Sequence, residues 1–213
     1  MDRVELIRAM HRSRLVAVVR SRSAEEALTT SQAAADGGVR FVEITFSVPG
    51  AIEVIKSLAK RADLQVGAGT VLSKKQAEEA IDAGAKFVVS PSLELDLIPL
   101  CHEAGVACFP GAATPTEILA AQRANADLVK IFPADCVGGP SFIRQMLGPF
   151  PDIRFMVSGG VSLSNVKEYV QVGVTGICLG SAYLASTLAQ KGHAGLVSEL
   201  KEFVKFVEEA QRN

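Results

Sequence analysis

The segment DLVKIFPA, residues 127–134, places a lysine in the middle of what reads as a buried β-strand. Val129 and Ile131 are β-branched residues of the kind that strands favour. Lysine is almost never fully buried unless it has a partner, so Lys130 needs an explanation. Because side chains alternate along a strand, Lys130 and Phe132 share one face, while Val129 and Ile131 share the other. What this segment does depends on which face points into the fold.

Seven other apolar runs accompany this segment, and amphipathic helical stretches separate them. The runs are mostly continuous rather than alternating, which is typical of strands buried on both faces of a parallel sheet. Helical stretches such as 23–38, 73–85 and 162–173 carry Ala, Glu, Lys and Leu at three- to four-residue spacing, and several begin with a serine cap. The eight runs are residues 15–19, 39–46, 64–71, 86–91, 106–111, 127–134, 154–161 and 176–182.

Eight strand–helix units in one chain predict an α/β fold, a single (β/α)8 TIM barrel formed by residues 1–213. An additional helix over about 2–12 precedes the first strand and could close the bottom of the barrel, and a last helix is expected over about 193–211. The alternative is an open doubly wound sheet. The residues after the first strand, VVRSRS at 18–23, lack the glycine-rich turn of a dinucleotide-binding sheet, so the barrel is favoured.

Composition excludes several classes of function. The net charge is −1 and no basic stripe is present, which argues against nucleic-acid or anionic-membrane partners. No apolar run approaches the roughly 20 residues that span a bilayer. The four cysteines lack a CxxC spacing and are predicted to be reduced, buried thiols of a cytoplasmic protein. The three histidines lie far apart, so we expect no metal site and no cofactor.

In a (β/α)8 barrel the active site lies at the carboxyl ends of the strands, and two titratable residues interrupt the strands there. If Lys130 points inward, burial disfavours its charged form, and a neutral amine can form a Schiff base with a carbonyl substrate. The alternative is an outward lysine that snorkels between helices. Glu43 interrupts FVEITF in the same way and could move protons, or it could form a structural buried ion pair with Lys130.

Glycines follow the seventh and eighth predicted strands. Gly159-Gly160 and Gly180-Ser181 lie where barrels frequently bind phosphate, because glycine lets backbone N–H groups approach an anion closely. The alternative is that both pairs form tight turns only. Together they predict a phosphorylated carbonyl compound as the ligand.

With these residues in place, the sequence resembles the class I 2-keto-3-deoxy-6-phosphogluconate (KDPG) aldolase / 4-hydroxy-2-oxoglutarate (KHG) aldolase family. The resemblance runs almost from end to end, and the motifs are far more specific together than singly. They are GGVRFVEITF around Glu43, VGAGTV at 66–71, SP at 90–91, PGAATPTE at 110–117, VKIFPA around Lys130, GPFP at 148–151, SGGV at 158–161 and LGSA at 179–182.

The resemblance implies a homotrimer of barrels and a metal-free retro-aldol reaction that releases pyruvate from a phosphorylated keto-acid. Lys130 matches the Schiff-base lysine, and Glu43 matches the acid/base glutamate. The phosphate site matches Gly159, Gly160, Gly180 and Ser181. The substrate-binding set that it suggests, mostly around the pyruvyl end, is Arg20, Ser47, Thr70, Gly111 and Phe132.

Two positions depart from the family pattern: Ser158, where many members have threonine before the two glycines, is the smaller departure, and Ser47 is the one that matters. Well-known KDPG aldolases carry an arginine four residues after the glutamate, and here that residue is Ser47. Arg20 at the end of the first strand is a plausible substitute, because a guanidinium suits carboxylate or phosphate; alternatively it is a solvated strand-end residue.

The predicted function is cleavage of KDPG to pyruvate and glyceraldehyde 3-phosphate. The alternatives within the family are KHG or 2-keto-3-deoxy-6-phosphogalactonate as the main substrate. A different class is a non-catalytic phosphosugar-binding barrel, which would need the glycine motifs but not Lys130 and Glu43. A metal-dependent aldolase is disfavoured, since no His/Asp cluster lies at the strand ends.

Overall fold

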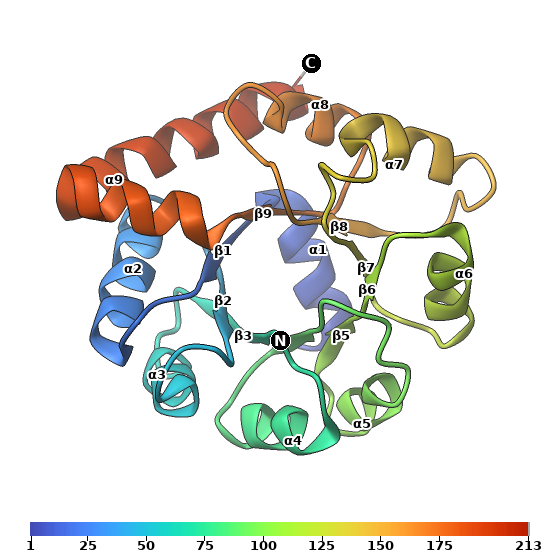
Figure 1. Cartoon of the computed structure of the whole chain (residues 1–213), viewed down its shortest axis with the longest axis horizontal. Coiled ribbons are helices and arrows are strands. Elements are labelled where there is room, and N and C mark those ends of the chain that lie inside the picture. The colour runs from blue at the N-terminus through green and yellow to red at the C-terminus, as the bar shows by residue number, and fades with distance from the viewer. Residues whose placement is uncertain (213) are drawn as a thin grey trace.

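A computed structural model describes residues 1–212 as a ring of parallel strands surrounded by helices (Figure 1). The strands pair in the order β5-β4-β3-β2-β1-β9-β8-β7-β6, and every pairing is parallel. They are β1 (Leu15–Val19), β2 (Phe41–Thr45), β3 (Gln65–Gly69), β4 (Phe87–Val89), β5 (Ala107–Phe109), β6 (Gly111–Ala112), β7 (Val129–Ile131), β8 (Phe155–Val157) and β9 (Gly176–Leu179).

Pro110 explains why there are nine strands where the sequence predicts eight. It lies between β5 and β6, and proline has no N–H to donate to a neighbouring strand. β5 pairs with β4 and β6 pairs with β7, so the two are one barrel strand interrupted at Pro110. The Pro110 carbonyl still accepts from the Lys130 N–H at 2.9 Å. This interrupted strand joins the two ends of the strand order, and the predicted eight-stranded barrel is confirmed.

Helices alternate with the strands and cover the outside of the ring (Figure 1). Side-chain caps start four of them: Asp2, Ser23 and Ser73 each accept an N–H three residues on, and Thr114 forms a capping box with Glu117. The helices are α1 (Arg3–Ser13), α2 (Ala24–Asp36), α3 (Ala51–Leu58), α4 (Lys74–Asp82), α5 (Leu97–Glu103), α6 (Pro115–Arg123), α7 (Gly139–Leu147), α8 (Val166–Gln171) and α9 (Ser181–Arg212).

The first and last helices have special places. Figure 1 shows α1 behind the centre of the ring, where it closes one end of the barrel as the sequence predicts. The predicted last helix, 193–211, is the second half of α9. α9 folds back at Gly192, whose φ of 67° and ψ of −174° lie outside the helical region. Glycine adopts that backbone conformation without a steric penalty.

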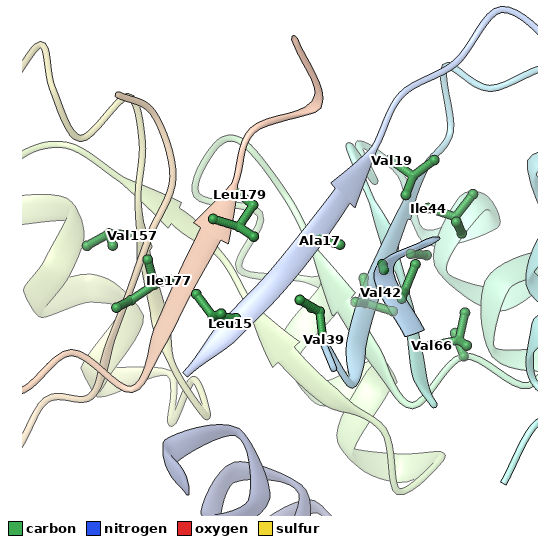
Figure 2. Packing of buried hydrophobic residues seen from close by; sticks show 14 of the residues in the cluster. Leu15, Ala17, Val19, Val39, Val42, Ile44, Val66, Val157, Ile177 and Leu179 are labelled. Carbon is green, nitrogen blue, oxygen red and sulfur yellow. The ribbon is translucent and has the colours of Figure 1, made fainter. Parts of the chain in front are cut away.

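Two hydrophobic cores lie on the two faces of the strands. The outer core packs strands against helices, and Figure 2 shows Leu15, Ala17 and Val19 of β1 in it. The alternate residues of β1, Val16 and Val18, belong to the inner core. The inner core also contains stacked aromatic rings, with ring centroids 6.1 Å apart for Phe41–Phe87 and 5.4 Å apart for Phe87–Phe109. These rings fill the lower part of the barrel and leave its carboxyl end for polar side chains.

The cysteines differ in one respect from the prediction. All four are free thiols and three are buried, but Cys136 in the loop after β7 is exposed. The prediction of four buried thiols was therefore wrong at Cys136, because the chain leaves the core strand at Phe132-Pro133 and passes over the surface. Among the described helices, none combines the length and apolar character that crossing a membrane requires.

Candidate active site

Lys130 and Glu43 face each other inside the carboxyl end of the barrel. Lys130 lies at the centre of β7, and its neighbours Val129 and Ile131 pack into the outer core, so its own side chain points inward. Glu43 lies at the centre of β2. Lys130 Nζ is 3.7 Å from Glu43 Oε1, and the two residues are only 5% and 1% exposed. The structure thus brings together the two residues that interrupt the predicted strands.

The Glu43 carboxylate is incompletely satisfied. Its Oε2 is buried and has no hydrogen-bond partner among the described residues. A buried carboxylate oxygen without a donor is costly, so folding alone gives no reason to retain it. Such an oxygen is available to exchange a proton with a substrate hydroxyl.

Two glycines of β3 make space for neighbouring side chains, Gly69 for Glu43 and Gly67 for Phe87. A Cβ on Gly69 would lie 2.0 Å from Glu43 Oε1, and a Cβ on Gly67 would lie 2.3 Å from the Phe87 ring. The sequence singles out the motif that contains them but not this role. The only signal that could have found it is the GAG triplet at the end of a core strand, where glycine otherwise weakens the strand.

Phe132 and Cys178 complete the surroundings of the lysine. The Phe132 ring lies 5.3 Å from Lys130 Nζ and is partly exposed at the mouth of the barrel, before a cis peptide bond to Pro133. Cys178 of β9 is fully buried in the inner core. Burial and then the Glu43 carboxylate raise the pKa of the Cys178 thiol, so this cysteine stays protonated. Sequence reasoning missed Cys178, since only barrel closure places β9 beside the pair.

Arg20, Ser47 and Thr70 form one polar cluster at the mouth. Arg20 donates to Ser47 Oγ at 2.8 Å and to Thr70 Oγ1 at 3.1 Å. Ser47 also shares a hydrogen bond of 2.8 Å with Thr45 Oγ1. Thr70 has a φ of 57°, an uncommon conformation for a threonine and one associated with functional sites. The two hydroxyls hold the exposed guanidinium of Arg20 in place at the ends of β1, β2 and β3.

Gly111 pairs with Lys130 in the β6–β7 register, so its backbone borders the lysine. It cannot be another residue without a shift, because a Cβ there would lie 2.3 Å from the Pro91 carbonyl carbon. This places the predicted residue beside the reacting end of the site.

The predicted phosphate-binding residues follow two paired strands, β8 and β9. Gly159 and Gly160 have φ of 108° and 67°, and a Cβ on Gly160 would lie 2.4 Å from Asp135 Cβ. A Cβ on Gly180 would meet nothing within 4 Å. Ser181 begins α9, so the first N–H groups of that helix are available to an anion.

Comparisons with known proteins identify the family of the chain. The family model described as "KDPG and KHG aldolase" matches residues 6–200. The chain belongs to the KDPG and KHG aldolase family. Like the family, it is an aldolase, a carbon–carbon lyase. No group of three or more His, Cys, Asp or Glu side chains that could hold a metal ion occurs within residues 1–212.

Relatives within the KDPG and KHG aldolase family extend over nearly the whole chain. The 2-dehydro-3-deoxy-phosphogluconate aldolase of Treponema pallidum is 34% identical over 200 residues, covering 93% of this chain and 95% of that protein. The KHG/KDPG aldolase of Escherichia coli K12 is 33% identical over 171 residues, 80% of each chain. A crystal structure of KDPG aldolase from Legionella pneumophila, with pyruvate captured at low pH as a covalent carbinolamine intermediate, aligns with a TM-score of 0.83 and 27% identity, covering 93% of this chain and 97% of that one.

Proposed function

We propose that this aldolase cleaves KDPG to pyruvate and glyceraldehyde 3-phosphate through a Schiff base on Lys130. The observation that carries the proposal is the buried pair at 3.7 Å between Lys130 Nζ and Glu43 Oε1, in which the other carboxylate oxygen has no partner among the described residues. A solely structural ion pair would be expected to satisfy both oxygens.

The proposed reaction uses the two residues in turn. Lys130 Nζ attacks the C2 ketone, and loss of water gives an iminium that withdraws electrons from C3. Glu43 accepts the C4 hydroxyl proton, directly or through a water, as the C3–C4 bond breaks. The electron pair of the broken C3–C4 bond forms the enamine, and glyceraldehyde 3-phosphate leaves. Protonation of the enamine at C3 and hydrolysis of the imine then release pyruvate and return the free amine.

The remaining site residues are assigned to the two anionic ends of the substrate. Arg20, held by Ser47 and Thr70, is proposed to bind the C1 carboxylate that every 2-keto acid carries. The backbone of Gly111 and the Phe132 ring border the pyruvyl carbons. At the other end, the backbone at Gly159, Gly160, Gly180 and Ser181 is proposed to hold the phosphate.

The covalent step is tested by borohydride reduction in the presence of pyruvate. We expect a stable adduct whose peptide contains Lys130, no adduct in Lys130→Ala, and an unchanged adduct in Lys86→Ala, a control at an exposed lysine before β4. Labelling that persists in Lys130→Ala would exclude the Schiff base.

The substrate is tested by comparing kcat/KM for KDPG, its galactonate epimer and KHG. Gly180→Ala separates phosphate binding from chemistry, because the added methyl meets no protein atom within 4 Å and would enter the proposed phosphate position. We expect KM to rise at least about tenfold for the two phosphorylated substrates, which corresponds to about 1.4 kcal/mol, and to change little for KHG.

A preference of the unmodified protein for KHG would make that acid the main substrate. No pyruvate release from any of them would favour the non-catalytic phosphosugar-binding barrel.

We infer a homotrimer from the family and a cytoplasmic location from the free cysteines. Light scattering of the purified protein tests the oligomer, and fractionation of the producing cells tests the compartment.

A further inference from the structure

A cavity lies at the end of the barrel opposite Lys130 and Glu43. It has a volume of about 460 Å³ and is bounded by α1 and by the residues that lead into β7, β8 and β9. Because all strands are parallel, these residues mark the amino-terminal end of the barrel, whereas the candidate active site lies at the carboxyl end. The volume is in the range of small-molecule sites, which is about 300–1,000 Å³.

The cavity is strongly cationic. Arg8 and Arg12 of α1 and Arg154 before β8 line it, and none of their guanidinium groups has a hydrogen bond or an ion pair within residues 1–212. The single carboxylate in the lining is Asp127, which accepts from Arg3 at 2.8 Å and contacts His102 Nε2 at 2.9 Å. Asp127 is therefore already neutralised from outside the cavity, and the three exposed arginines have no ion-pair partner among residues 1–212.

The positive charge around the cavity contributes to a lowered pKa of His11. His11 also lines the cavity, and its pKa is lowered by burial and by the charges of Arg14 and Arg154. A protein of net charge −1 thus concentrates unpaired cations at one hollow. Such an arrangement attracts anions.

Thr175 supplies an independent sign of a ligand. It lies just before β9 and lines the cavity, it is 2% exposed, and its hydroxyl makes no hydrogen bond to any described residue. The hydroxyl is not fully enclosed by protein, so it opens onto the cavity and is free to donate to a ligand there. Apolar side chains of α1, Val4 and the buried Ile7, form another part of the wall.

We propose that this cavity binds a small anionic metabolite through an oxyanion group, either carboxylate or phosphate. Arg8, Arg12 and Arg154 hold the oxyanion, because guanidinium groups donate paired hydrogen bonds to such groups. Thr175 donates to a ligand oxygen, and Ile7 and Val4 contact an apolar part of the ligand. The occupant joins α1 to the barrel and stabilises the folded protein by an amount that grows with the logarithm of its concentration relative to Kd. The site is separate from the aldolase site and does not depend on its proposed function.

The test uses the full chain with inorganic phosphate and citrate as two probes, followed by calorimetric titration and thermal unfolding. The Gly180→Ala variant is the parent, so that the proposed phosphate position of the aldolase site is blocked. In this parent we expect one saturable site for at least one of the probes, and binding should raise Tm. Adding Arg8→Gln and Arg154→Gln to the parent should weaken that binding at least tenfold. Arg123→Gln, an exposed arginine of α6 outside the cavity, is the matched control and should leave binding unchanged.

The two probes distinguish the class of ligand, and a second variant tests the site independently of the arginines. Binding of phosphate but not citrate would indicate a phosphorylated ligand, and the reverse would indicate a carboxylate ligand. Thr175→Val preserves shape and should also weaken binding. Equal titrations in the parent and the arginine variant would overturn the proposal, as would a Tm rise that sodium chloride reproduces at the same ionic strength.

Discussion

Two carboxylates near opposite ends of the barrel differ in how completely they are satisfied. Asp127, two residues before β7, accepts hydrogen bonds from Arg3 at 2.8 Å and from the Cys108 N–H at 2.9 Å, and it contacts His102 Nε2 at 2.9 Å. Glu43 is more deeply buried, yet its nearest cation is Lys130 Nζ at 3.7 Å and its second oxygen has no partner among the described residues.

The difference separates stability from chemistry. The contacts of Asp127 tie α1, α5 and β5 to the start of β7, as expected of a residue at the stabilising face of a barrel. Glu43 and Lys130 lie at the carboxyl end of the barrel, where we propose the active site, and they violate the rule that buried charges are fully paired, which is expected where function, rather than folding, selects a residue. Substitutions at Glu43 and Lys130 should therefore reduce activity without loss of stability, and a substitution at Asp127 should reduce stability without loss of activity.

The largest effect is expected at Lys130. Lys130→Met removes the proposed nucleophile, so pyruvate release from KDPG should fall by more than about 10⁴-fold. In the double variant Lys130→Met/Glu43→Gln both buried charges are gone, and we expect the free energy of unfolding in urea to rise by about 1 kcal/mol or more. A double variant that is markedly less stable than the parent would mean that the pair is structural.

Glu43→Gln should separate proton transfer from Schiff-base formation. The amide has nearly the same shape but cannot accept the C4 proton, so kcat should fall by about 10²–10⁴-fold. Borohydride trapping of pyruvate on Lys130 should persist, as judged by mass spectrometry. Glu53→Gln on the exposed face of α3 is the control. If Glu43→Gln retained full kcat, its role as the base would be disproved.

Asp127→Asn should show the opposite pattern. It weakens charge-assisted bonds to Arg3 and His102, so the free energy of unfolding should fall by about 2 kcal/mol. kcat/KM for KDPG should stay within about twofold, since the residue lies at the other end of the barrel. A large loss of kcat/KM with unchanged stability would contradict the comparison.

Glu199 offers a smaller, pH-dependent version of a satisfied carboxylate. Lys191, Tyr183 and Thr187, four residues apart on one face of the first half of α9, all donate to it from across the bend at Gly192. Hydrogen bonds from Lys191 and then Tyr183 lower the pKa of Glu199 below its ordinary value. The contribution of Glu199 to stability is therefore present above the ordinary glutamate pKa and is lost as the pH falls through the lowered folded-state pKa.

Glu199→Gln should accordingly destabilise the protein by about 0.5 kcal/mol at neutral pH, and the difference from the parent should disappear in acid. Urea unfolding at a series of pH values measures it, with the exposed neighbour Glu202→Gln as the control. A difference that grows toward acid pH would show that the hydrogen bonds to the charged form do not stabilise the bend.

Much of the barrel follows from local pattern. Continuous apolar runs mark the strands, serine caps mark the starts of α2 and α4, and the alternation of Val129, Lys130 and Ile131 requires that the lysine and its neighbours face opposite sides. These features depend on residues close together in the chain, so the sequence contains them directly. The break at Pro110 and the fold-back at Gly192 were not predicted. Both depend on how β5 and α9 pack against neighbouring elements, which the sequence does not show.

By itself, the sequence determined that a lysine and a glutamate interrupt two core strands, that glycine pairs follow two others, and that a serine replaces the arginine expected at position 47. Only the tertiary structure decided that Glu43 reaches Lys130, that Gly69 leaves the space for it, and that Arg20 is held by Ser47 and Thr70. The physical reason is that these contacts join strands far apart in the chain. Their distances are set by barrel closure and strand register, which no local pattern encodes.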